Sequence, residues 1–194
     1  VESGRLSLSA GYAKADLAVH RSSAGYRAFV SNLPAELQGQ LSGSGADASF
    51  SSLGMQWDDG RWIVSAELAR VTADAFTNSA TGAYLAVGRR FGNLTPYVSL
   101  ARQWEDEPLV DAAEAGAYAA QIAPFNRSRN QAQRSLTAGV RWDVLHNAAI
   151  KAEFAHMRTD SGAHGTFIAR DNPFAPGLDH QSINLMSISV DVVF

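Results

Sequence analysis

The chain has 194 residues, a formal net charge of -3 and a pI near 5.9, and it contains no cysteine. The balanced charge, without any cluster of lysine and arginine, argues against a nucleic-acid partner. The lack of cysteine excludes a disulfide framework and a thiolate metal site. No segment approaches the roughly 18 consecutive apolar residues of a membrane-spanning helix, which excludes a helical membrane protein but not one built from alternating strands.

Period-two alternation of apolar and polar residues predicts about eight strands along the chain. They cover residues 5–17, 48–57, 61–71, 81–91, 94–104, 134–144, 148–158 and 182–194. Their lengths suit tilted strands that cross a membrane better than the shorter strands of typical soluble sheets.

The connections between these strands alternate strictly in length. Tight turns are expected at 58–60, 92–93 and 145–147, and longer loops are expected near 19–47, 72–80, 105–133 and 159–181. In an antiparallel barrel every second connection lies at the same end, so the chain has a short-turn end and a long-loop end, as outer-membrane barrels do. Residues 32–41 and 111–123 have helical character, and short helices there could narrow the mouth or pack between neighbouring barrels.

Each predicted strand has an apolar face and a polar face. In the last strand, Met186, Ile188, Val190 and Val192 alternate with serines and Asp191. Across all strands the polar face carries seven charged residues, Glu67, Arg90, Arg141, Asp143, Lys151, Glu153 and Asp191. A soluble core avoids so many charges because burying unpaired ions is costly, whereas a water-filled lumen accepts them. We therefore predict that these residues line a pore, although each one could equally form a structural ion pair on the wall.

Aromatic residues gather near the predicted short-turn end, where a membrane-interface girdle is expected. These residues are Trp57, Trp62, Phe91 and Trp142, together with the terminal Phe194. The alternative is that they are core aromatics of a soluble barrel. The remaining residues of the polar face are mostly Ser, Gly, Ala and Thr, which would fill an eight-stranded barrel poorly, so a wall of a wider barrel of roughly 16 strands is favoured.

Several segments resemble the C-terminal half of Gram-negative outer-membrane porins of the porin-like superfamily. The resemblance is carried by LGMQWDDGRWIVSAELARV, GAYLAVGRRFGNLTPYVSLAR, SLTAGVRWDVLHNAAIKAEFAHMR and INLMSISVDVVF. It implies an antiparallel transmembrane β-barrel in the outer membrane, a homotrimeric channel for small hydrophilic solutes, in contact with the lipid bilayer and lipopolysaccharide. It also implies that Phe194 is the signal recognised by the barrel-assembly machinery. Such porins are roughly twice this length, and their constriction loop would lie in the half that is absent here.

The catalytic motifs of common enzyme families are missing, so we expect neither an enzyme nor a cofactor. His164 and His180 share a loop with Asp160, Asp171 and Asp179, which could hold a divalent ion, but spacing of this kind is weak evidence and a solvated polar loop is favoured. His156 has serines nearby and no carboxylate to orient it. The competing functions are a small closed outer-membrane barrel with a structural, adhesion or loop-mediated binding role, and a soluble ligand-binding barrel.

Overall fold

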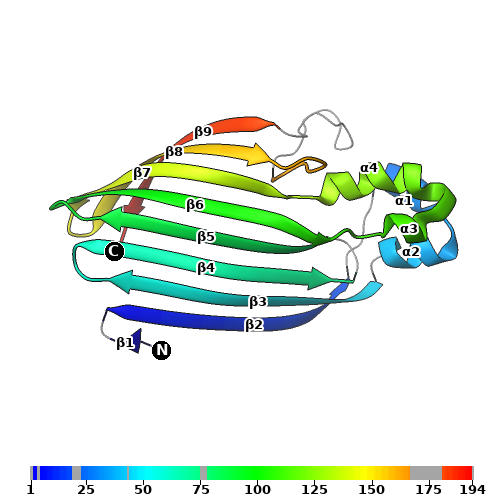
Figure 1. The fold of residues 1–194 in the computed structure, drawn as a ribbon, viewed down its shortest axis with the longest axis horizontal. Coiled ribbons are helices and arrows are strands. Elements are labelled where there is room, and N and C mark those ends of the chain that lie inside the picture. The colour runs from blue at the N-terminus through cyan, green and yellow to red at the C-terminus, as the bar shows by residue number, and fades with distance from the viewer. Residues whose placement is uncertain are drawn as a thin grey trace.

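The computed structural model describes residues 2–3, 5–18, 23–42, 44–74, 78–166 and 181–193. These residues form an all-β fold in which the strands lie side by side in sequence order within one antiparallel sheet (Figure 1). The two-residue strand β1 (Glu2–Ser3) precedes eight long strands. The long strands are β2 (Leu6–Ala18), β3 (Ser44–Asp58), β4 (Trp62–Ala73), β5 (Ser79–Arg89), β6 (Leu94–Glu107), β7 (Gln133–Leu145), β8 (Ala148–Thr159) and β9 (Ser182–Val192). The prediction of eight antiparallel strands is confirmed.

The sheet is open within the described residues. Its ladder runs from β1 to β9 without a pairing that joins the two edges, so the strands do not close into a barrel. The tight turns all lie at one end of the sheet and the long connections at the other (Figure 1). Gly60 and Gly92, with φ of 88° and 62°, supply the left-handed backbone that two of these turns require.

Several strands extend further into the long connections than alternation predicts. Strand β3 begins at Ser44 and β6 ends at Glu107, so the loops expected at 19–47 and 105–133 are shorter than predicted. Polar pairs continue the ladder beyond the apolar part of the strands. One of them joins Lys14 Nζ to Asp47 Oδ2 at 2.8 Å. Apolar alternation does not detect such pairs, which explains the difference.

The two longest connections fold into short helices. Helices α1 (Ala24–Ser31) and α2 (Ala35–Ser42) follow β2, and α3 (Ala112–Ala115), the 3-10 turn η1 (Gly116–Tyr118) and α4 (Ala119–Arg129) follow β6. The predicted helical segments 32–41 and 111–123 are thus confirmed, whereas α1 was not predicted. Among the helices that the structure describes, none is long and apolar enough to cross a membrane.

Helices from both connections pack on one another at the long-loop end, and we call residues 24–42 and 109–129 the helical cap (Figure 1). Leu33, Leu37 and Leu41 from the first connection contact a cluster from the second. That cluster consists of Leu109, Val110, Ala115, Ile122 and Phe125. The ring of Phe29 stacks on that of Phe125 at 5.8 Å, and Tyr26 donates a hydrogen bond to the Leu41 carbonyl at 2.8 Å. The cap therefore has a small hydrophobic core of its own.

The cap is tied to the sheet through Asn78, which lies between β4 and β5. Its Oδ1 accepts a hydrogen bond from the backbone N–H of Leu109 at 2.9 Å, and its Nδ2 donates to Glu105. Asn130 donates to the other oxygen of Glu105 at 2.7 Å. These bonds fix the start and the end of the β6–β7 connection.

Replacing Phe125 by Ala should loosen the cap without disturbing the strands. Phe125 is only 2% exposed at the centre of the cap core, and removal of a buried phenylalanine costs about 3–5 kcal/mol. Hydrogen exchange should accelerate across 24–42 and 109–129 and stay unchanged in β4 and β7. The exposed Gln121→Ala in the same helix is the control, and equal acceleration in both variants would contradict a packed cap.

Candidate functional surfaces

One face of the sheet is apolar and exposed over its whole width. The register places Leu53 opposite Leu68, Leu100 opposite Leu136 and Phe154 opposite Met186 on this face. Ile188 is 79% exposed and Met186 80%. The buried apolar residues instead lie mainly in the helical cap. The apolar face thus lacks a covering layer among the described residues.

The total exposed area confirms that the sheet is not folded into a compact domain. The solvent-accessible surface is 12152 Å², whereas a compact folded monomer of 20.7 kDa exposes roughly 8,900 Å². The excess of about 3,000 Å² reflects a single-layered sheet that leaves both of its faces exposed.

Aromatic side chains end the apolar face on the short-turn side. The register places Trp57, Trp62 and Trp142 on this face, with Phe91 in the turn that follows β5. The guanidinium of Arg89 lies 5.1 Å from the Trp62 ring and 4.9 Å from the Phe91 ring, a cation–π arrangement. The predicted row of aromatics therefore occupies one face and one end, while Phe194 lies outside the described residues.

The two borders of the apolar face slant in parallel across the strands. Residues paired across successive strands form a row, and the row through the polar Asn184 on β9 reaches Leu8 on β2. On β2 the first charged residue of this face is Lys14, which lies six residues further towards the long-loop end. At the short-turn border, the row through Trp57 on β3 reaches Ala138 on β7. The aromatic border residue of β7 is Trp142, four residues further towards the short-turn end. Both borders thus shift by about one residue per strand in the same direction, which defines a belt of constant width.

Arginine side chains lie at the border on the long-loop side, and the sequence analysis missed them. Arg102 pairs with Arg134 and Arg134 with Arg158 on the adjacent strands β6, β7 and β8, while Arg70 lies on β4. Each arginine lies on the apolar face, because it stands an even number of positions from the apolar residues of its own strand. Arg70, for example, is two positions after Leu68. Each strand by itself shows a single arginine at the end of its apolar residues, and only the register aligns Arg102, Arg134 and Arg158 in a row.

The opposite face carries all seven charged residues predicted to line a pore, and most of them form ion pairs. Arg90 makes two contacts with Asp58 at 2.6 and 2.7 Å. Arg141 contacts Asp143 at 2.9 Å and Asp191 at 3.3 Å. The structure therefore brings these residues into local pairs of mixed sign.

The remaining charged residues of this face differ in their surroundings. Lys151 lies 3.2 Å from Glu153. Glu67 lies opposite Tyr84 in the register and makes no ion pair among the described residues. A hollow of about 360 Å³ beside Glu67 and Tyr84 is lined further by Gln103 and Gln133. Glu67 is thus a half-buried carboxylate that borders this hollow.

Tyr97 is a residue of this face that sequence reasoning missed. Its hydroxyl donates a hydrogen bond to Glu153 Oε1 at 2.6 Å, and its ring passes over Gly139 on the strand between them. A Cβ at Gly139 would lie 2.5 Å from that ring. The contact spans β6, β7 and β8, so only the register between strands reveals it.

Asp59 organises the turn between β3 and β4. Its Oδ1 accepts hydrogen bonds from the backbone N–H groups of Trp62 at 2.6 Å and Arg61 at 2.8 Å. These bonds, above all the one from Trp62, hold the pKa of Asp59 below its usual range. The carboxylate therefore remains ionised and fixes the turn that positions Trp62.

The candidate chemical residues are not assembled into a reactive site within the described part of the chain. His156 Nδ1 lies 2.8 Å from Asn184 Oδ1, at the border of the apolar face. Asp160 forms an ion pair with Arg102, and His164 is buried. His180, Asp171 and Asp179 lie outside the described residues, and no cluster of three metal-ligating side chains occurs among the rest.

No protein-family model and no curated protein matches this chain.

Gly139→Ala should destabilise the sheet more than Gly82→Ala. A methyl group at Gly139 collides with the Tyr97 ring and displaces its hydrogen bond to Glu153, whereas the nearest atom at Gly82 is 3.9 Å away. Overpacking of this kind costs about 1–3 kcal/mol. Equilibrium unfolding in denaturant measures the difference, and equal midpoints for the two variants would contradict the placement of Tyr97.

Proposed function

We propose that the chain forms part of the wall of an outer-membrane barrel that lets small hydrophilic solutes diffuse passively. The single observation that carries this proposal is the belt of exposed apolar residues on one face of an antiparallel sheet whose other face is polar and charged. In a transmembrane barrel the apolar face contacts lipid and the polar face contacts water.

The shape of the belt supports a membrane-crossing sheet. A shift of about one residue per strand, with a rise of about 3.3 Å per residue and a strand spacing of about 4.8 Å, corresponds to a tilt of about 30–35°. Outer-membrane strands tilt by about 35–45°. On β7 the belt spans eight residues between Arg134 and Trp142, or about 22 Å along the normal after this tilt, compared with about 25 Å in such barrels.

Closure of the sheet is part of the proposal. Open sheet edges do not occur in the hydrocarbon of a bilayer, because their backbone polar groups would remain unsatisfied. Further strands, from the same polypeptide or from other copies, must therefore pair with β9 and with the β2 edge. The small residues of the polar face, such as Ser99 and Gly139, favour a wide barrel of roughly 16 strands over a filled one of eight.

The paired charges on the polar face define the type of channel. Arg90, Arg141 and Lys151 each face a carboxylate, so this wall presents mixed charge and attracts neither ion strongly. Water and small polar solutes of either sign can pass such a wall, with Glu67 as a local attraction for cations. The proposed partners are lipid with lipopolysaccharide, the assembly machinery that inserts the barrel, and two further copies in a trimer.

Planar-bilayer conductance tests the proposal. The folded chain, reconstituted with neutral lipid, is expected to give stepwise openings. If copies of the chain close the sheet in that sample and it still conducts no current, the result contradicts the channel and favours a closed barrel with a structural or binding role.

Two adjacent arginines test which face lines the lumen. Arg90 lies on the polar face, where its loss leaves Asp58 unpaired, whereas Arg89 lies on the apolar face. Arg90→Ser, and likewise Arg141→Ser, should shift the reversal potential under a salt gradient towards cation preference, and Arg89→Ser should leave it unchanged. A shift with Arg89→Ser alone would reverse the assignment of the faces.

A further inference from the structure

The three arginines at the long-loop border of the apolar face form an unusual row. Arg102, Arg134 and Arg158 are directly opposite one another on adjacent strands and on the same face. Directly opposed residues of an antiparallel pair have Cβ atoms about 4.5–5.5 Å apart, and like charges at this distance are destabilising. An anion that neutralises the row would therefore stabilise it.

The described part of the protein supplies little of that neutralisation. Asp160 reaches Arg102 at 3.4 Å, a long contact for an ion pair. Arg134 and Arg158 make no ion pair with any described residue, and Nε of Arg158 is buried there without a hydrogen-bond partner. Among the described residues, the three guanidinium groups therefore have one carboxylate contact, which Arg102 makes.

The other arginines of the apolar face are engaged differently. Arg70 contacts Asp106 at 3.1 Å, and Arg89 stacks on two aromatic rings at the opposite border. Among the arginines of the apolar face that the structure describes, only those of the row on β6, β7 and β8 therefore lack sufficient neutralising charge.

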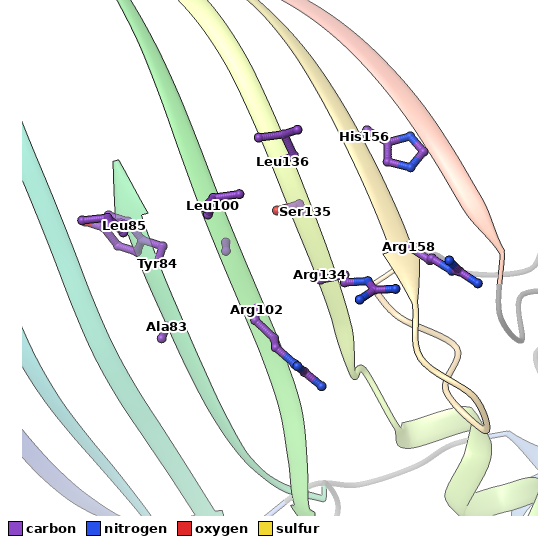
Figure 2. Close-up of a pocket in the computed structure, with 11 residues that line it drawn as sticks. Ala83, Tyr84, Leu85, Leu100, Arg102, Arg134, Ser135, Leu136, His156 and Arg158 are labelled. Atoms are coloured by element: carbon purple, nitrogen blue, oxygen red, sulfur yellow. The ribbon is translucent and has the colours of Figure 1, made fainter. Parts of the chain in front are cut away.

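A hollow adjoins the row on its apolar side. It measures about 530 Å³, and Leu85, Leu100 and Leu136 line it together with the three arginines. Figure 2 shows the arginine side chains on neighbouring strands, displaced from the leucines towards the end of the sheet that carries α4. A ligand that fills this site must be anionic at one end and apolar at the other.

We propose that the row binds the phosphate group of an acylated lipid, with an acyl chain lying along Leu85, Leu100 and Leu136. This inference rests on the proposed function, because it needs the apolar face to contact a lipid leaflet. Guanidinium groups bind phosphate through paired, charge-assisted hydrogen bonds, which a lysine ammonium cannot reproduce. The row lies where the belt ends, at the depth of lipid headgroups.

Native mass spectrometry with dioleoyl phosphatidic acid as the probe tests the site. Three samples in neutral detergent are compared. The first contains the protein with this lipid, the second contains it with dioleoylglycerol, which lacks the phosphate, and the third contains it with this lipid and inorganic phosphate as a competitor. Wild-type protein should retain phosphatidic acid but not dioleoylglycerol, and millimolar phosphate should not displace it. Replacing all three arginines by Gln should weaken retention about tenfold or more.

Single substitutions separate binding from folding. Arg134→Gln should weaken phosphatidic acid retention while leaving the lipid-free protein at least as resistant to denaturant, because it relieves like-charge contacts. Arg134→Lys should bind more weakly than wild type, and Arg89→Gln, on the same face at the opposite border, should bind as wild type does.

Three results would overturn the site. They are equal retention by the triple variant, equal retention of dioleoylglycerol, and displacement by inorganic phosphate, which would indicate a free-anion site. Insertion into phosphatidylcholine vesicles, measured by protease protection, is scored separately. Failure to insert contradicts the proposed function, whereas normal insertion with unchanged lipid retention contradicts only this inference.

Discussion

The constraint on which the rest of the structure depends is a single-layered sheet whose apolar face is covered by no other part of the described chain. The hydrophobic effect normally buries such a face against a second layer, but here the protein core is confined to the helical cap. The strands are held by their ladder hydrogen bonds and by whatever medium covers the belt. Under the proposed function, the hydrocarbon core of a lipid bilayer is this medium.

The features at the two ends of the strands follow from the same constraint. A belt that ends in water needs amphipathic side chains at its borders, and it has Trp62 and Trp142 at one border and Arg102 and Arg134 at the other. The polar face can carry Arg141 and Glu153 because it needs no apolar cover. The cap then gathers the two longest connections at one end, above the arginine border.

Much of this fold can be predicted from the sequence of each strand by itself. Alternation over 61–71 and 134–144 locates β4 and β7 and assigns their faces, because side chains of a strand alternate strictly. Relations between strands need the register, which is why the contact of Tyr97 with Glu153 across Gly139 was missed. The arginine row was missed because no single strand shows three neighbouring charges. Helix α1 was missed because its stability comes from the packing of Tyr26 and Phe29 on Phe125, a partner about a hundred residues away.

The most direct test of the account is the environment of consecutive side chains along one strand. Because the chain contains no cysteine, single cysteines at 97–101 in β6 can each carry a nitroxide spin label in protein reconstituted with neutral lipid. The account predicts that labels at 98 and 100 are accessible to oxygen in the bilayer, whereas labels at 97, 99 and 101 are accessible to a water-soluble relaxation agent. Uniform access of the water-soluble agent to all five positions, or the reverse alternation, would contradict it.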